Sequence, residues 1–210
     1  MKVVAISDTH GAHGRLAVPR CDLLVHCGDV TRGGREAEVR AFLAWFAAQP
    51  AAHKLLVGGN HDRFLEREPE RARRLVESYG VTYLFDEELT IDGRRIWGSP
   101  VTPRFRDMAF NRDRGAAIRA HWDRVPADLD LLVTHGPPQG LGDRMVLGLR
   151  VGCADLTERV RQVPPRVHVF GHIHEARGEY TLPGIATRFL NVASRRLLPV
   201  GIHEPVAFEL

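Results

Sequence analysis

The stretch KVVAISDTH (residues 2–10) carries the pattern that decides the fold, a short apolar run that turns polar at its end. Its β-branched residues and its length indicate one buried strand. The residues Asp8, Thr9 and His10 would then follow the carboxyl end of that strand. In α/β folds, functional sites gather in the crevice beyond the carboxyl ends of the strands. This stretch therefore predicts both an architecture and a place for chemistry.

Four further strand-like runs along the chain end in the same way. They are DLLVHCGD (22–29), HKLLVGGN (53–60), DLDLLVTHG (128–136) and RVHVFGHIH (166–174). The polar residues at or directly after these ends are Asp29, Asn60, His61, Asp62, His135, His172 and His174. Five strand ends that lie side by side could bring these side chains to one spot.

The segments between these runs complete a layered α/β pattern. Helices are predicted over 35–49, 67–80, about 113–124 and 153–163. Strands are predicted over 81–87 and 88–100, with Asp92-Gly93 as a hairpin turn, and short irregular strands over about 185–210. Because strands alternate with helices and no repeat or linker interrupts them, we expect one α/β domain over 1–210. Two aperiodic loops, 101–112 and 137–152, are candidates for functional segments.

Composition excludes several classes of protein. The 210-residue chain has a formal net charge of only +3 with neutral histidines, which is too small by itself to argue for nucleic acid. The three cysteines, Cys21, Cys27 and Cys153, are few and odd in number, so we expect buried thiols and no disulfide framework. No apolar stretch approaches a membrane span, and the first ten residues make a poor secretory signal. We therefore expect a cytoplasmic protein without a membrane partner.

The polar residues at the strand ends form a chemically coherent metal-binding set. Oxygens from Asp and Asn and nitrogens from His suit Mn, Fe and Zn better than Ca or Mg. The set exceeds what one ion needs, so two ions sharing one bridging carboxylate fit better. In an extended segment, His172 and His174 would point to the same side and could serve both ions. The glycines at 28, 59, 136 and 171 would let neighbouring backbones approach closely.

Each of these residues also has an ordinary structural explanation. A single Asp8 or Asp29 is commonly a helix cap or a turn residue, and a single His135 is commonly a hydrogen-bonded core or surface histidine. Asn60 after two glycines is typical of a turn. The coincidence of ligand-competent residues at five strand ends favours a binuclear metal site over these separate explanations.

The motifs DTH, GD, GNHD, an isolated His and GHIH, in this order, resemble the signature of the calcineurin-like metallophosphoesterases. Their surroundings look like bacterial relatives of the metallophosphoesterase-domain (MPPED) proteins and the class III cyclic nucleotide phosphodiesterases. The surroundings that carry this resemblance are ISDTH, LLVHCGDVT, MAFNRDRG, LLVTHGPP and RVHVFGHIHE, so nearly the whole chain is covered. GDVTRGG (28–34) lacks the second Asp of the protein-phosphatase motif GDxxDRG, which argues against a protein phosphatase.

The resemblance implies a more specific fold and a ligand set. The fold would be two mixed β-sheets packed as a sandwich and flanked by helices. Two divalent or trivalent transition metal ions are implied, Mn first, with Fe or Zn possible. The first ion would be held by Asp8, His10, Asp29 and His174. The second ion would be held by Asp29, Asn60, His135 and His172, with Asp29 as the bridge.

The expected reaction is hydrolysis of a phosphate ester. Two ions can clamp a phosphate and activate a bridging water, whose hydroxide attacks phosphorus in line. The catalytic residues would be Asp29 and His61, with His61 as the general acid that protonates the leaving alkoxide. A role for His61 in orienting its neighbours is the alternative. Asp62 is expected to be a surface or cap residue and not a partner of His61.

The substrate is predicted as a small phosphodiester, namely a cyclic nucleotide or a related nucleotide diester. Alternatives are a phosphomonoesterase, a nuclease acting on nucleic-acid ends, or a non-enzymatic metal-binding scaffold. The scaffold is disfavoured because His61 and all the implied ligands are present. The sequence leaves open whether the chain is a monomer or a homodimer. Candidate phosphate contacts, if they are not simply solvated loop residues, are Arg104, Arg106, Asn111, Arg112, Arg114, Gln139 and Arg144.

Overall fold

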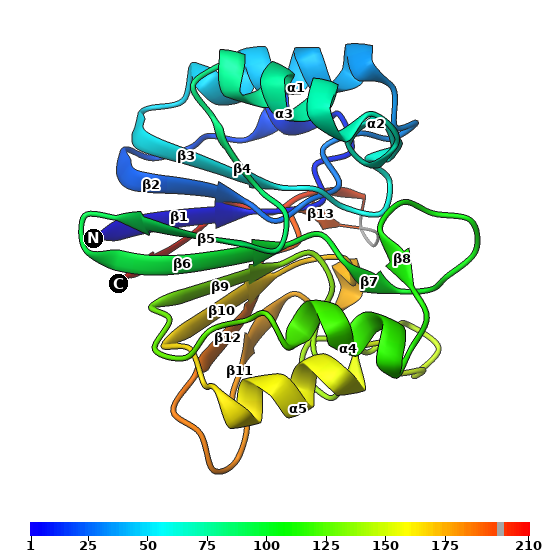
Figure 1. Ribbon diagram of the computed structural model, residues 1–210. Coiled ribbons are helices and arrows are strands. Elements are labelled where there is room, and N and C mark those ends of the chain that lie inside the picture. Colours follow the sequence, from blue (N-terminus) through cyan, green and yellow to red (C-terminus); the bar gives the residue numbers. More distant parts are fainter. Residues whose placement is uncertain (197–199) are drawn as a thin grey trace.

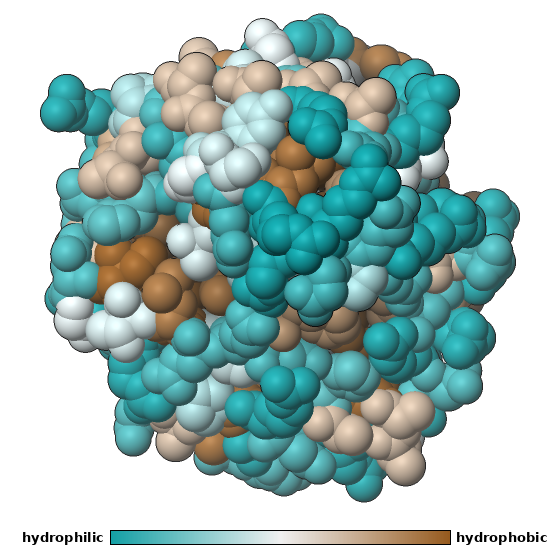
Figure 2. Space-filling view, turned by 45° about the horizontal axis from the view of Figure 1, so that its top comes forward, coloured by the Kyte–Doolittle hydropathy of each residue, from teal (hydrophilic) through white to brown (hydrophobic). Residues whose placement is uncertain are grey.

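The computed structural model of the chain describes residues 1–196 and 200–210. Two mixed β-sheets lie face to face at its centre, and helices cover the outer face of each sheet (Figure 1). The predicted sandwich of two mixed sheets flanked by helices is confirmed. Figure 2 shows a surface that is mainly hydrophilic on the face drawn, with a few separate hydrophobic patches.

The first sheet has five strands in the order β15-β1-β2-β3-β4. Strands β1 to β4 are parallel to one another, and only β15 runs antiparallel, beside β1. The carboxyl ends of β1, β2 and β3 therefore lie along one edge of the sheet. The strands are β1 (Lys2–Ile6), β2 (Cys21–His26), β3 (Ala51–Val57), β4 (Thr82–Leu84) and β15 (Val206–Glu209).

The second sheet has six strands in the order β11-β12-β10-β9-β6-β5. Its four central strands are parallel, and the two edge strands are antiparallel to their neighbours. The strands are β5 (Glu87–Ile91), β6 (Arg94–Ser99), β9 (Leu131–Thr134), β10 (Val167–Phe170), β11 (Gly178–Tyr180) and β12 (Arg188–Asn191). Two small ribbons pair β7 (Thr102–Pro103) with β8 (Asn111–Arg112) and β13 (Arg195–Arg196) with β14 (Gly201–Ile202).

Helices α1 (Glu36–Ala47), α2 (Arg63–Arg67) and α3 (Pro69–Ser78) lie over the first sheet, and α4 (Ala116–Trp122) and α5 (Ala154–Gln162) lie over the second (Figure 1). Two short 3₁₀ turns, η1 (His13–Arg15) and η2 (His174–Ala176), complete the described elements. The predicted apolar face of α1 is buried, and its residues are Val39, Phe42, Leu43 and Phe46.

The alternation of side chains along β1 explains how the layers hold together. Val3 and Ala5 pack into the core between the two sheets, whereas Val4 and Ile6 pack against the helices of the first sheet. All four side chains are fully buried. A strand that is covered on both faces reads as a continuous apolar run, which is the pattern seen in residues 2–6.

Several predicted boundaries were wrong because partner strands and close backbone contacts decide where a strand ends. The predicted strand over 166–174 ends at Phe170, so His172 and His174 do not lie on an extended segment. The predicted helix over 67–80 begins at Pro69 and is preceded by the unpredicted α2. The predicted hairpin turn is confirmed, since Ile91 pairs with Arg94. In the predicted strand region 185–210, positions 197–199 lie outside the described residues.

The three cysteines are buried and unpaired, as predicted. The indole Nε1 of Trp122 donates to the Sγ of Cys153 at 3.2 Å, and burial raises the pKa of the Cys153 thiol. Among the described residues, no helix combines the length and the apolar character that are needed to cross a lipid bilayer.

His168 is a fully buried histidine on β10, packed against Phe170 and Phe189. Its Nε2 lies 2.8 Å from the hydroxyl oxygen of Thr134. Burial lowers the pKa of His168 from 6.5 to about 3, because the charged imidazolium would lose its hydration. The folded state therefore holds this side chain neutral, whereas the unfolded chain takes up a proton as the pH falls below 6.5.

We expect acidification to destabilise the fold through this histidine. Between pH 7 and pH 5 the unfolded chain binds a proton at His168, whereas the folded chain does not. The free energy of unfolding therefore falls by about 2 kcal/mol. The stability is present above the unfolded pKa of 6.5 and is lost progressively toward pH 3. In urea titrations at both pH values, His168→Gln should lose about 2 kcal/mol less than the wild type between pH 7 and pH 5. The exposed His53→Gln is the control, and an unchanged pH response in His168→Gln would contradict the assignment.

Candidate metal centre

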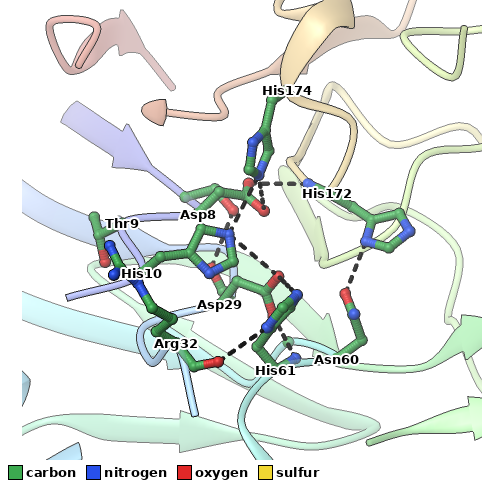
Figure 3. Close-up of polar contacts among 12 residues, drawn as sticks. Asp8, Thr9, His10, Asp29, Arg32, Asn60, His61, His172 and His174 are labelled. Carbon is green, nitrogen blue, oxygen red and sulfur yellow. Dashed lines mark hydrogen bonds and ion pairs between the residues drawn. The ribbon is translucent and has the colours of Figure 1, made fainter. Parts of the chain in front are cut away.

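The carboxyl ends of β1, β2, β3, β9 and β10 converge at one side of the two-sheet core. The loops that follow them bring the predicted ligands together (Figure 3). The predicted ligands so assembled are Asp8, His10, Asp29, Asn60, His135, His172 and His174. Most of these side chains are buried, so the cluster forms the floor of a cavity and not a set of solvated surface groups.

One part of the cluster consists of Asp8, His10 and His174, whose ligand atoms lie within 4.8 Å of one another. The Nε2 of His174 lies 3.4 Å from Asp8 Oδ1 and 3.3 Å from His10 Nε2. The Nε2 of His10 is also 3.7 Å from Asp29 Oδ2. These four side chains are the set expected to hold the first ion.

The other part consists of Asp29, His135 and His172, again with ligand atoms within 4.8 Å. The Oδ1 of Asn60 lies 2.8 Å from both His135 Nε2 and His172 Nδ1. Asp29 Oδ1 is 3.5 Å from His135 Nε2, while its second oxygen faces His10. The Asp29 carboxylate thus stands between the two groups, where a bridging ligand would have to lie.

The hydrogen bonds of His10 and His135 direct the Nε2 atom of each ring toward other acceptor atoms of the cluster. The Nδ1–H of His135 donates to Cys27 O at 2.8 Å, and the Nδ1–H of His10 donates to Thr31 O at 3.1 Å. In the neutral ring form that binds a metal ion, each Nε2 would then be unprotonated and directed at other acceptors. The buried Oδ1 of Asp8 has no hydrogen-bond partner among the described residues. Such a set of acceptors fits positively charged ions at its centre.

The shifted pKa values of Asp8, Asp29 and His135 also indicate that the cluster favours added positive charge. Burial raises the pKa of Asp8 and Asp29, but neighbouring histidines outweigh it and hold both carboxyl pKa values well below the ordinary range. Burial lowers the pKa of His135, but the Asp29 carboxylate outweighs it and raises the pKa to about 9. Without a cation, a proton on His135 would supply the missing charge. Metal ions would compete with that proton.

The backbone at these positions is held in an uncommon conformation. Asp8, His10, Asp29 and His172 have φ angles of 55°, 43°, 60° and 69°. The left-handed region costs free energy for residues with a Cβ and persists only where surrounding contacts impose it. Those contacts include the His10 N–H donating to Asp29 O at 3.0 Å and the His172 N–H donating to Asp8 Oδ2 at 2.9 Å. The positive φ of His172, not an extended strand, places its ring in the cluster.

Three of the predicted glycines are required by close approach. A Cβ at Gly28, which has a φ of 100°, would lie 2.6 Å from Gly58 O and from His135 Nδ1. A Cβ at Gly59 would collide with the backbone nitrogen of Asp29, and a Cβ at Gly171 would collide with Asp8 Oδ2. At Gly136 a Cβ would meet only the Thr102 side chain, at 3.1 Å. The expectation of close packing therefore holds strongly at Gly28, Gly59 and Gly171 and weakly at Gly136.

Asp62 is the residue that sequence reasoning misplaced. It is completely buried and makes no side-chain cap bond to α2, although it occupies the cap position of that helix. Its carboxylate accepts hydrogen bonds from the backbone N–H groups of residues 29, 30, 31 and 59 and from the Thr31 hydroxyl. It therefore ties the loop that carries Asp29 to the loop that carries Asn60. No local pattern distinguishes a buried Asp of this kind from an exposed cap.

His61 lies beside the cluster and lines the cavity, with 36% of its side chain exposed. Its Nδ1–H donates to Arg32 O at 3.2 Å, and its Nε2 lies 4.0 Å from Asp29 Oδ2 (Figure 3). Its ring contacts the ring of His10 edge-on, with 4.7 Å between centroids. Its second nitrogen is thus directed at the cluster from the solvent side.

The cavity above the cluster has a volume of about 610 Å³. Of the predicted phosphate contacts, Arg104, Arg106 and Arg114 line it. The other four predictions fall elsewhere, because each has a structural partner or lies on another face. Asn111 holds the carbonyls of residues 105 and 106, and Arg112 pairs with Glu66 and His121. Arg144 lines a second hollow, and Gln139 is exposed outside the cavity.

Comparison with known proteins agrees with this geometry. The sequence model described as calcineurin-like phosphoesterase matches residues 1–176. The chain belongs to the calcineurin-like phosphoesterase family. Metallophosphoesterase domain-containing protein 1 of Homo sapiens is 34% identical over 232 residues, covering 100% of this chain and 71% of that protein. A UPF0046 protein of Caenorhabditis elegans is 36% identical over 205 residues, covering 92% of this chain and 69% of that protein.

Two solved structures share this fold. One covers 99% of this chain and 99% of its own, with a TM-score of 0.68 at 17% identity. The crystal structure of TT1561 of Thermus thermophilus covers 90% of this chain and 88% of its own, with a TM-score of 0.61 at 12% identity. The family and its metallophosphoesterase relatives identify the chain as a phosphoesterase enzyme, and its clustered His and Asp side chains could hold metal ions.

We expect Asp62→Ala to weaken both the fold and metal binding, although Asp62 is not among the predicted ligands. The substitution leaves several buried N–H donors without an acceptor, which should lower the free energy of unfolding by about 3 kcal/mol or more. Urea denaturation and calorimetric titration with Mn²⁺ measure the two effects. The exposed Asp123→Ala is the control. Wild-type stability and Mn²⁺ affinity in Asp62→Ala would contradict the role of this residue.

Proposed function

We propose that the protein is a metal-dependent phosphodiesterase with two cations at the floor of the cavity. The single observation that carries the proposal is the position of the Asp29 carboxylate, which faces His10 with one oxygen and His135 with the other. One such carboxylate between two sets of donors is the arrangement that a pair of ions requires. Membership of the phosphoesterase family supports this interpretation.

The donor sets assign the residues to two positions. The first ion would be held by Asp8, His10, Asp29 and His174, and the second by Asp29, Asn60, His135 and His172. Mixed carboxylate, amide and imidazole donors suit Mn most, with Fe or Zn as the other candidates. When bound, such ions supply Lewis acidity toward the phosphate and lower the pKa of water.

His61 is proposed as the general acid. Its Nδ1–H is engaged by Arg32 O, so a proton on Nε2 is the one available toward the cavity. In hydrolysis a water oxygen forms a new bond to phosphorus, and the bond from phosphorus to the leaving oxygen breaks. The Nε2 proton of His61 would pass to that leaving oxygen and release an alcohol.

The charges around the cavity favour a diester over a monoester. A diester carries one negative charge, whereas a monoester carries close to two at neutral pH. Arg104 is paired with Asp113, and Arg114 donates to the carbonyls of Gly152 and Val151 at 2.8 and 3.0 Å. Among the described residues that line the cavity beyond the cluster, Arg106 is the cation left to bind a second charge. The nucleotide diesters that the sequence resemblance implies stay a prediction.

Metal removal and reloading test the proposal. The chelated protein should be inactive on an aryl phosphodiester, and Mn²⁺ should restore activity with two ions per chain by elemental analysis. Hydrolysis of the diester should exceed that of the matching monoester. Asp29→Asn should bind at most one ion and lose at least about 100-fold in kcat/KM, because one ligand serves both positions. Asp123→Asn is the matched control, and full activity after chelation would overturn the proposal.

A second experiment tests the general acid. His61→Ala should keep both ions and lose about 10²–10⁴-fold in kcat on an alkyl leaving group, which needs a proton. On a nitrophenolate leaving group, which departs without one, the loss should be much smaller. His53→Ala, an exposed histidine outside the cavity, should behave as the wild type. Equal losses for all leaving groups would remove the acid role and leave an orienting one.

A further inference from the structure

Most of the exposed large apolar side chains belong to Phe105 and to one loop, residues 145–149, that borders the cavity. Phe105 and Met145 line the cavity and are 54% and 37% exposed. Val146, Leu147 and Leu149 follow on the same loop as Met145 and are 67%, 88% and 63% exposed. Among the described residues, Val200 is the one other large apolar side chain exposed to this degree. A gathering of apolar groups beside a site indicates a binding surface.

The cavity itself has two chemically different halves. Its floor consists of His and Asp side chains of the cluster. Its outer wall is largely apolar and includes Pro103, Phe105, Met108, Met145, Val151 and Ile173; Arg104, Arg106, Arg114 and Glu175 also line the cavity. A ligand that fills both halves would have an anionic end and an apolar end.

The arginines near the mouth do not form a track for a polyanion. Arg104 and Arg114 are engaged by Asp113 and by the 151–152 backbone. Arg106 lies over the Phe105 ring, 5.1 Å from its centroid, and pairs with no carboxylate among residues 1–196 and 200–210. A strand of nucleic acid needs a groove with several free cations that follow its backbone. The outer half of the cavity therefore favours an apolar group over further phosphates.

The exposed loop is a defined hairpin. Arg144 and Arg150 form an antiparallel bridge, and the Met145 N–H donates to Leu149 O at 2.9 Å. At the base, the buried Asp143 accepts from Arg150 Nη1 at 2.9 Å and from the Gly140 N–H at 2.9 Å. These bonds hold the apolar tip out beside the cavity. Hydrocarbon placed against the tip would gain free energy as both surfaces leave water.

We propose that this outer half is a subsite for an apolar organic group of the phosphodiester. A hydrocarbon chain or ring would run from the cluster past Phe105 and Met145 toward Leu147 at the tip. The proposal rests on the proposed function, because it places the phosphate at the floor of the same cavity. It names the substrate class as amphiphilic phosphodiesters, with a phosphate head and an apolar substituent.

A series of alkyl p-nitrophenyl phosphates tests the subsite in the Mn²⁺-loaded protein. The leaving group is constant, while the alkyl group that stays on phosphorus grows from methyl to butyl to octyl. Kinetics are measured below the concentration at which the octyl ester forms micelles. KM should fall by up to about fourfold for each methylene that becomes buried. A KM that does not depend on chain length would overturn the proposal.

Variants locate the subsite. Phe105→Ser combined with Met145→Ser should flatten the dependence on chain length, and Leu147→Ser should flatten it only for the octyl ester. Val200→Ser is the matched control, because Val200 is 80% exposed and is not among the residues that line the cavity. An unchanged slope in the double variant would overturn the location.

Two further measurements separate this proposal from the proposed function. If the loaded wild type hydrolyses no diester, the proposed function fails, and calorimetric binding of methyl, butyl and octyl phosphate still tests the subsite. Tighter binding of the longer phosphates supports it, and equal affinity overturns it. Light scattering examines self-association. A wild-type dimer that Leu147→Ser dissociates would assign the exposed tip to an interface and overturn the subsite.

Discussion

The site depends on one electrostatic constraint, which is that acceptor atoms face one another across a buried space. The Asp29 carboxylate lies between two groups of imidazoles, and the Nδ1–H groups of His10 and His135 are engaged by backbone carbonyls. Such an arrangement is stabilised by positive charge. The pKa of His135 is raised for the same reason, because a proton on its ring supplies positive charge beside Asp29. Asp62 keeps the arrangement in place by holding the backbone of the Asp29 loop.

The two-sheet core holds these acceptor atoms together despite their mutual repulsion. The loops that carry the ligands have positive φ angles at four of the predicted ligand positions, and such a backbone persists only when rigid strands fix both of its ends. Parallel strands supply that rigidity because their carboxyl ends lie together at one edge of each sheet. The floor and the outer wall of the cavity therefore differ in chemical character. The floor of the cavity is polar and fixed by the strands, whereas its outer wall comes mainly from the 101–112 and 137–152 loops. Under the two proposals, phosphate binding and the choice of organic group would be properties of separate segments.

Part of the fold and of the site could be predicted from local patterns. A run such as residues 2–6 is apolar at almost every position, so its burial between two layers follows from the sequence. The polar residues after five strands could be identified because strand ends and ligand-competent side chains are both local features. The geometry of His172 and His174 could not be predicted. It depends on Gly171 lying against Asp8 and on the left-handed φ of His172, both of which are contacts between distant segments.

The sequence by itself determined which side chains were available for the site and the order in which they follow the strands along the chain. Both can be predicted because hydrophobic periodicity and residue type are properties of short segments. Only the tertiary structure decided that Asp62 is buried, that Arg104 pairs with Asp113 and that Arg114 donates to a backbone carbonyl. It also decided that Phe105 and Met145 line the cavity and that the loop continuing from Met145 is exposed. The physical reason is that burial, ion pairing and exposure are set by whatever packs against a residue, and for these residues the partner comes from another part of the chain.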